Sequence, residues 1–233
     1  MKEGYLLKRK TEHGVVSPQE LEKINQYTRR EFQAQELYAF SVVLCDNQVD
    51  RDFERFTEAT LAEMAERFVG LPVLRDHRWS SETQTARVYA GSVESSEGGT
   101  QRLVLRCYMP RTEQTAPTIA AIESGILREC SVGLAVLRVL CSICGANQRE
   151  TLCLHIQGRE YDGQVCHMDL DGVADAYEIS LVAVPAQPEA GVIKSKRYGG
   201  QEPPPESHPS GGAPGEDTAW QDEALLELEK NRF

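Results

Sequence analysis

The sequence contains no run of eighteen apolar residues, and its first ten residues, Met1–Lys10, lack the apolar core of a secretory signal peptide. A membrane-spanning helix needs about twenty mainly apolar residues, so we expect neither insertion into a membrane nor transport across one. The sequence therefore predicts a chain that stays in the cytosol of the cell that makes it.

Basic residues are scarce and scattered. The chain has 25 Lys and Arg against 36 Asp and Glu, a formal net charge of −11, and no basic stripe. Neutralising nucleic-acid phosphates requires clustered Lys and Arg, so we expect no nucleic-acid binding, and protein partners are favoured instead. Residues 199–233 hold eight acidic and two basic residues, a net charge of −6. The acidity is therefore mainly a property of the tail.

The sequence also lacks the even number of cysteines that complete disulfide pairing requires. The chain has 7 cysteines in 233 residues, whereas a secreted disulfide scaffold is shorter and pairs its thiols evenly. We therefore expect reduced thiols, some of them bound to a metal ion.

The chain is long enough to bury one sizeable core, and its composition divides it into four parts. A segment of Pro, Gly, Glu and Ser has too few apolar residues to offset the entropy lost on ordering, so it is expected to be a disordered linker. After it, the apolar residues between Trp220 and Leu228 lie close to one face of a predicted helix. We expect that last helix to need a partner. The predicted parts are an N-terminal segment with a short helix (1–35), a main domain (36–198) with a cysteine-rich insertion (141–167), a disordered linker (199–218) and an acidic amphipathic C-terminal helix (219–233).

Three helices and a set of strands are expected in the main part of the chain. A capping box at Ser17 to Glu20 predicts the first helix, Thr57 begins the second, and the third is expected over Thr115–Leu127. This pattern predicts an α+β fold with a strongly curved, barrel-like, mostly antiparallel sheet and helices packed outside. The expected strands are Leu37–Leu44, Pro72–His77, Ala86–Val93, Arg102–Met109, Cys130–Leu140 and Tyr177–Val184.

Three residues favour nucleophilic catalysis. Ser131 lies on its predicted strand opposite the apolar row that contains Val132 and Leu134. A hydroxyl is a poor nucleophile near neutral pH unless an imidazole accepts its proton and a third group orients that imidazole. His77 is the candidate base, and Glu178, on an apolar strand, is the candidate third group.

Each of these residues also has an ordinary structural interpretation. His77 could be a partly buried residue before Trp79, Ser131 a strand residue that satisfies a backbone group, and Glu178 a solvent-facing charge. Ser180, on the same strand face as Glu178, could be a supporting hydrogen-bond partner. The sequence does not say which backbone N–H groups would form an oxyanion hole.

The insertion predicts a metal site. Two thiolates in the spacing Cys-x-x-Cys-Gly can hold one ion, because the glycine permits a tight bend. Alternate residues of an extended segment point to one face, which favours adding Cys153 and His155. Four nitrogen and sulfur ligands leave no open position, so we expect structural zinc and no zinc hydrolase chemistry. The preferred ligands are Cys141, Cys144, Cys153 and His155, with Cys166 as the main competitor, His167 as a further donor, and free or redox-active cysteines as the alternative.

Several of these stretches resemble the bacteriophage prohead proteases, which are related in fold to the herpesvirus assemblins. The resemblance extends from about Leu37 to Ala190, and its motifs occur in the same order. The segments that carry it are Asp50–Phe56, Gly70–His77, Ala86–Tyr89, Cys130–Gly133 and Tyr177–Val182, the last leading to Pro185 and Ala186.

The resemblance implies a serine endopeptidase that cleaves capsid scaffold and major capsid protein segments during capsid maturation. Ser131 then matches the nucleophile, His77 the family histidine, and Glu178 the acidic position of the last motif. The enzyme would work in the host cytoplasm within the assembling viral prohead. The rival interpretation is a catalytically inactive capsid- or scaffold-binding assembly module of the same fold, and the sequence leaves homo-oligomer formation open.

Overall fold

The computed structural model describes residue 14 and residues 16–96, 98–183 and 191–192. The predicted linker at 199–218 and C-terminal helix at 219–233 lie outside these residues, so those two predictions stay untested. None of the helices in the described ranges has the length and the hydrophobicity that crossing a membrane requires.

Three α-helices form where the capping signals occur. Helix α1 is Pro18–Asn25 with the complete capping box of Ser17 and Glu20, and α2 is Glu58–Arg67 with Thr57 as N-cap. Helix α3 covers only Ala116–Glu123, so the expected extension to Leu127 is wrong. Gly125 has a φ of 72° directly after this helix, and Ile126 is 81% exposed instead of lying on a buried face. Short 3-10 helices occupy Ala34–Glu36 (η1) and Ser81–Thr83 (η2).

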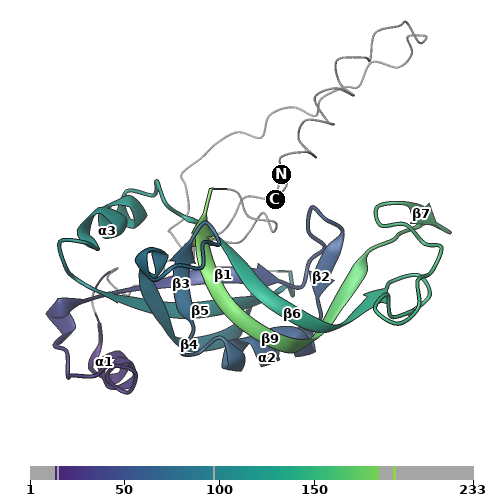
Figure 1. The fold of residues 1–233 in the computed structure, drawn as a ribbon. Helices are drawn as coiled ribbons and strands as arrows, with labels where there is room; N and C mark the ends of the chain where they lie inside the picture. Colours follow the sequence, from purple (N-terminus) through teal and green to yellow (C-terminus); the bar gives the residue numbers. More distant parts are fainter. Residues whose placement is uncertain (1–13, 15, 97, 184–190, 193–233) are drawn as a thin grey trace, which may run out of the picture. The chain divides into compact units, whose positions relative to one another are not determined.

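The sheet is strongly curved and barrel-like, as the sequence predicts (Figure 1). Its strand order is β2-β9-β3-β4-β5-β1-β10-β6. Strand β9 also pairs with β6, so the hydrogen-bonded strands from β9 to β6 form a closed circuit. All pairs are antiparallel except those that β9 makes with β2 and β3. The strands are β1 (Leu37–Asp46), β2 (Glu54–Phe56), β3 (Pro72–Arg75), β4 (Ala86–Ser95), β5 (Gln101–Pro110), β6 (Glu129–Cys141), β9 (Met168–Val182) and β10 (Gly191–Val192).

Strand β9 is much longer than the predicted Tyr177–Val184, because it already begins at Met168. Its first half carries aspartates that interrupt the apolar pattern but have basic partners. Arg55 Nε lies 2.5 Å from a carboxylate oxygen of Asp169, and Arg138 Nε lies 2.7 Å from one of Asp171. Together β6 and β9 form one long curved ribbon, with register shifts that locally increase its bend (Figure 1).

The main core lies between the sheet and α2. Leu61 and Met64 of α2 and Phe68, directly after its end, share one face and are fully buried against the strands, as their spacing predicts. Burying one such side chain contributes about 1.5–3 kcal/mol. The same core holds three cysteines, Cys45, Cys107 and Cys130, which have no disulfide partners. Burial raises the pKa of the Cys107 thiol to about 12, so these cysteines act as apolar core residues.

Helix α1 is fixed to the sheet by a partly buried polar contact. Glu20 accepts a 2.8 Å hydrogen bond from the hydroxyl of Tyr89 and forms an ion pair with Arg106. Ile24, also on α1, packs in a second apolar cluster with Leu37 and Tyr89. The N-terminal helix is therefore part of the same packed structure as the strands.

Candidate active site and candidate metal centre

His77 lies in a turn directly after β3, and the expectation that the strand extends to it is wrong. Asp76 and His77 have φ values of 54° and 52°, which cost a non-glycine residue about 1–2 kcal/mol. Two hydrogen bonds hold this turn: Asp76 N–H donates to the carbonyl of Leu181 at 3.1 Å, and His77 N–H donates to Oγ of Ser180 at 3.0 Å. Strain that is retained in this way points to a functional position.

Glu178 is buried, with an exposed fraction of only 2%, and both of its oxygens are hydrogen-bonded. Oε1 lies 2.7 Å from Nδ1 of His77, and Oε2 accepts a 2.7 Å hydrogen bond from the hydroxyl of Ser180. The interpretation of Glu178 as a solvent-facing charge is therefore wrong. A buried carboxylate is stable only with such partners, and Ser180 bonds to both members of the pair.

Strand pairing places Ser131 beside this group. In the β6–β9 ladder Ser131 lies directly opposite Ser180, and Gly133 lies opposite Glu178. Opposed residues share a face of the sheet, with Cβ atoms about 4.5–5.5 Å apart. Ser131 is partly buried, and within the described residues its hydroxyl has no hydrogen-bond partner. Catalytic hydrogen bonds often form fully only when substrate is bound.

Gly133 is required by the carboxylate across the ladder. A Cβ atom at this position would lie 2.5 Å from Oε1 of Glu178, far inside van der Waals contact. The space that the missing side chain leaves is occupied by the carboxylate that bonds His77. The Ser-x-Gly spacing thus has a structural reason: the serine and the carboxylate occupy neighbouring positions on one face of the sheet.

The orientation of the imidazole suits a general base. Because Nδ1 faces the carboxylate of Glu178, the proton of a neutral His77 is placed on Nδ1, and Nε2 is left as an acceptor. In a serine hydrolase the carboxylate bonds Nδ1 and the nucleophile gives its proton to Nε2. The imidazole side chain is 42% exposed, so a substrate can approach it.

A pocket of about 430 Å³ opens beside Ser131. Three carboxylates, those of Asp50, Asp52 and Glu54, lie on one side of it. Burial, with the nearby like charges, raises the pKa of Asp50 and of Glu54. Sequence reasoning missed this pocket, although the Asp50–Phe56 segment was one of the resembling stretches. Its lining consists of Leu44, Cys45, Asp50, Asp52, Glu54, Phe56, Cys130, Ser131, Val132, Leu134, Ala135, Val136, Val139, Arg149 and Leu170.

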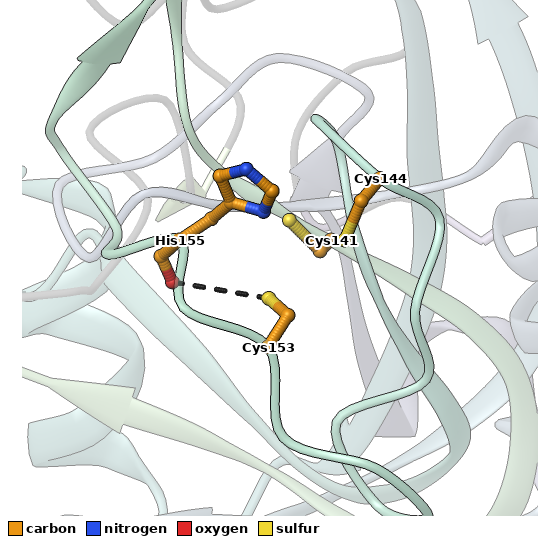
Figure 2. Close-up of side chains that lie close together, drawn as sticks. All are labelled: Cys141, Cys144, Cys153 and His155. Atoms are coloured by element: carbon orange, nitrogen blue, oxygen red, sulfur yellow. Dashed lines mark hydrogen bonds between the residues drawn. The ribbon is translucent and has the colours of Figure 1, made fainter.

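The cysteine-rich insertion lies at the end of the β6–β9 ribbon (Figure 1). The donor atoms of Cys141, Cys144, Cys153 and His155 all lie within 4.8 Å of one another, so this cluster can hold a metal ion. Figure 2 shows the four residues around one common point. They are the four preferred ligands. Cys166 lies outside this cluster although its Sγ is 3.9 Å from that of Cys141, and burial raises the pKa of its thiol to about 11.

The local backbone explains why the cluster forms. Gly145 has a φ of 72°, and its N–H donates to the carbonyl of Cys141 at 2.8 Å, which closes the tight bend between the first two cysteines. The pKa of the Cys141 thiol is lowered, because N–H groups of the same bend outweigh the effect of its burial. A hydrogen bond from the backbone of His155 lowers the pKa of the Cys153 thiol. Both thiols are thus shifted toward the thiolate form that binds metals.

The environment of the His155 ring nitrogen Nδ1 indicates that a metal ion fits this cluster. Nδ1 of His155 is buried and has no hydrogen-bond partner among the residues that the structure describes, and leaving such a group unsatisfied costs about 1–3 kcal/mol. The ring is held edge-on to Tyr161, with 4.7 Å between the ring centroids. A metal ion among the three sulfurs would supply the missing partner of this nitrogen. Three soft sulfur donors and one imidazole form a set typical of tetrahedral zinc sites.

A small hairpin completes the insertion and was not predicted. Strands β7 (Glu160–Tyr161) and β8 (Gln164–Val165) are joined by Asp162 and Gly163, which have φ values of 50° and 83°. Two residues with positive φ form the tight turn that suits a two-residue hairpin, and Asp-Gly is a strong sequence signal for it.

No protein-family model matches this chain, and no curated protein and no solved structure matches it significantly.

Proposed function

We propose that the chain is a serine endopeptidase of the prohead-protease type, with Ser131 as nucleophile, His77 as general base and Glu178 as the group that orients His77. The observation that carries this proposal is the buried Glu178 carboxylate, which lies opposite Gly133 in the β6–β9 ladder and bonds the strained His77 at 2.7 Å, while Ser131 lies two residues before Gly133 on the same face. Buried carboxylate–imidazole pairs next to a partly exposed serine are the arrangement that activates a hydroxyl.

The proposed chemistry follows from these positions. Ser131 Oγ forms a bond to the carbonyl carbon of the scissile peptide as its proton passes to Nε2 of His77. The imidazolium then gives that proton to the leaving amine when the C–N bond breaks, and an acyl-enzyme remains. Water, deprotonated by the same imidazole, hydrolyses it. The Glu178 carboxylate stabilises the imidazolium through the Nδ1 hydrogen bond.

The motif resemblance supplies the proposed biological role. Segments of the capsid scaffold and of the major capsid protein would be the substrates, cut within the assembling prohead in the host cytoplasm. We further propose that the metal of the insertion is zinc with a structural role. Cys141, Cys144, Cys153 and His155 fill a tetrahedron, so no position remains for water or substrate.

Co-expression with the matching scaffold protein tests the proposal. Wild type is expected to shorten the scaffold, and intact masses should show discrete products. Ser131→Ala should leave every chain at full mass, whereas Ser92→Ala, an exposed serine on β4, should behave as wild type. Identical products from wild type and Ser131→Ala would contradict the proposal.

One observation favours a second candidate, the inactive assembly module. Leu152, Leu154 and Ile156 alternate with the metal-binding residues of the insertion and are 83%, 94% and 49% exposed. Large exposed apolar side chains in a row mark a binding surface. In this interpretation the insertion would bind capsid or scaffold protein without cleaving it, and Ser131→Ala would leave assembly unchanged.

A further inference from the structure

The metal-binding insertion takes part in the pocket beside Ser131. Arg149, which lies between the metal-binding residues Cys144 and Cys153, lines the same pocket as Ser131. Val139, on the strand that leads into the insertion, lines it as well. The pocket wall is thus built partly from the barrel and partly from the insertion.

A second contact joins the insertion to the acidic loop of residues 50–54. The side-chain amide of Gln157, two residues after the metal-binding His155, donates to the carbonyl of Asp52 at 3.1 Å and to that of Phe53 at 3.5 Å. Gly158 lies against the ring of Phe53, where an added Cβ would be 2.8 Å from the nearest ring atom. The loop is therefore in contact with the segment that the metal would hold.

This loop needs external support. Phe53 has a φ of 57°, an unfavourable value for a bulky residue. Within the loop, one carboxylate oxygen of Asp50 accepts hydrogen bonds of 2.9 Å from the N–H groups of Asp52 and Glu54. From outside, Gln157 bonds its carbonyls, and Met168 N–H donates to Phe53 at 2.9 Å. The backbone of the loop that carries these carboxylates is thus held by one residue of the insertion, Gln157, and by one residue of β9, Met168.

We propose that the metal-binding insertion forms and holds the substrate pocket beside Ser131, with Gln157 as a positioning residue, so that the metal controls substrate binding and not the acyl-transfer chemistry. This inference rests on the proposed endopeptidase function. His77 is held by the hydrogen bonds that its ring and its backbone N–H make to Glu178 and Ser180 on β9, and these bonds do not involve the insertion. Metal removal therefore disturbs the pocket and leaves the general base in place.

The lining indicates which side chain the pocket accepts. Its barrel side is apolar and includes Leu44 and Val136. The charged lining consists of three carboxylates, those of Asp50, Asp52 and Glu54, against the single cation of Arg149, so the pocket carries an excess of negative charge. None of these three carboxylates forms an ion pair within the described part of the chain. A peptide side chain with an aliphatic stem and a cationic end would bury its stem and neutralise the carboxylates. The substrate class is therefore a peptide with Lys or Arg next to the scissile bond.

A peptide library tests the pocket in the full-length protein. Digestion of the library by wild type, with mass spectrometry of the products, should show Lys or Arg enriched at one position beside the cut. Gln157→Ala and metal-free protein should both raise KM about tenfold with kcat within about twofold, the effect of losing the two hydrogen bonds of Gln157. Gln164→Ala is the matched control, because its amide bonds Ser142 inside the insertion and should leave KM unchanged.

Amide hydrogen exchange gives a readout that does not depend on cleavage. Metal removal should increase exchange at residues 50–56 and leave residues 178–182 protected, and Gln157→Ala should do the same with its metal still bound. Unchanged exchange at 50–56 would overturn the proposed positioning. Cleavage with no preference for a basic residue, or with KM unaffected by the metal, would overturn this inference and leave the endopeptidase proposal standing. If wild type cleaves nothing, the proposed function fails, and the substrate-binding part of this inference fails with it.

Discussion

The candidate active site and the candidate metal centre are built in opposite ways. His77, Ser131 and Glu178 come from three segments that are far apart in the sequence, and the pairing of β3, β6 and β9 brings those segments together. The four residues of the metal cluster lie within the single stretch Cys141–His155, which is absent from the main core and contributes only to a small cluster around Cys141, Cys166 and Met168. The barrel thus positions the first group, whereas ligand chemistry must position the second.

The two regions also differ in what satisfies their polar groups. The carboxylate of Glu178 is buried but has protein partners on both oxygens. Nδ1 of His155 is buried and has no partner within the described ranges of the chain. The polar groups of the first site are satisfied by the protein alone, whereas the second site can hold an ion that would satisfy this nitrogen. This comparison predicts different responses to mutation and to metal removal.

The largest expected effect is that of Glu178→Gln on catalysis. The amide keeps the size of the side chain but favours the wrong tautomer of His77, so kcat should fall by about 10⁴-fold. The metal content, measured by elemental analysis, should not change. Steady-state cleavage assays of wild type and variant give the comparison, and an activity loss below about tenfold would mean that Glu178 does not orient the base.

Metal removal should affect the cysteine-rich insertion and not the candidate active site. Structural zinc sites contribute about 10 kcal/mol or more to the folding of small metal-binding modules, so Cys144→Ser or a chelator should unfold the insertion. Amide exchange should rise throughout residues 141–167 while α2 stays protected. Wild type should hold one metal ion per chain by native mass spectrometry. An insertion that stays protected without metal would show that packing holds it.

A smaller effect is expected from Gly133→Ala. The added methyl group would contact the Glu178 carboxylate, which must then move and take the His77 ring with it. A displacement of about 1 Å in a catalytic group can cost about 10²-fold in rate. Ser92→Ala, at an exposed position on β4, is the control. Equal kcat values for both variants would argue against the Gly133–Glu178 contact as a determinant of geometry.

The candidate metal centre lies within one short stretch and the candidate active site does not, and this difference explains which features the sequence could predict. The four clustered metal-binding residues follow from local chemistry: the Cys-x-x-Cys-Gly spacing and the alternation of Cys153 and His155 carry the information within one short stretch. The α+β class and the curved sheet also follow from local patterns. For Ser131, His77 and Glu178 the spacing alone is a weak signal, and the motif resemblance singled them out.

What the sequence could not predict depends on long-range contacts. The turn at His77 is stabilised by Ser180 and Leu181, which no local pattern around residue 77 reveals. The sequence did not predict that β9 begins at Met168, because the aspartates in its first half are typical of loops. Only the fold brings Arg55 and Arg138 beside them as partners. The contact of Gln157 with the acidic loop joins residues 105 positions apart. Such pairings are consequences of the fold, not of local sequence.

The smallest expected effect lies outside both regions. Although burial raises the pKa of Glu20, hydrogen bonds from Ser17 and Tyr89 lower it below its ordinary value of 4.5. A lowered folded-state pKa stabilises the protein above the unfolded pKa, and this stability is lost as the pH falls through the folded value. Glu20→Gln should cost about 1 kcal/mol at pH 7 and nearly nothing well below pH 4, measured by urea unfolding. An equal loss at both pH values would contradict this assignment.

Covalent labelling of Ser131 tests the central claim most directly. An organophosphonate fluoride forms an O–P bond with an activated serine and releases fluoride, and its reaction requires no knowledge of the substrate. Wild type should gain one adduct, located at Ser131 by peptide mass spectrometry, and His77→Ala should gain none. Unlabelled wild type, or equal labelling of the two proteins, would contradict the account of His77, Glu178 and Ser131 as one catalytic group.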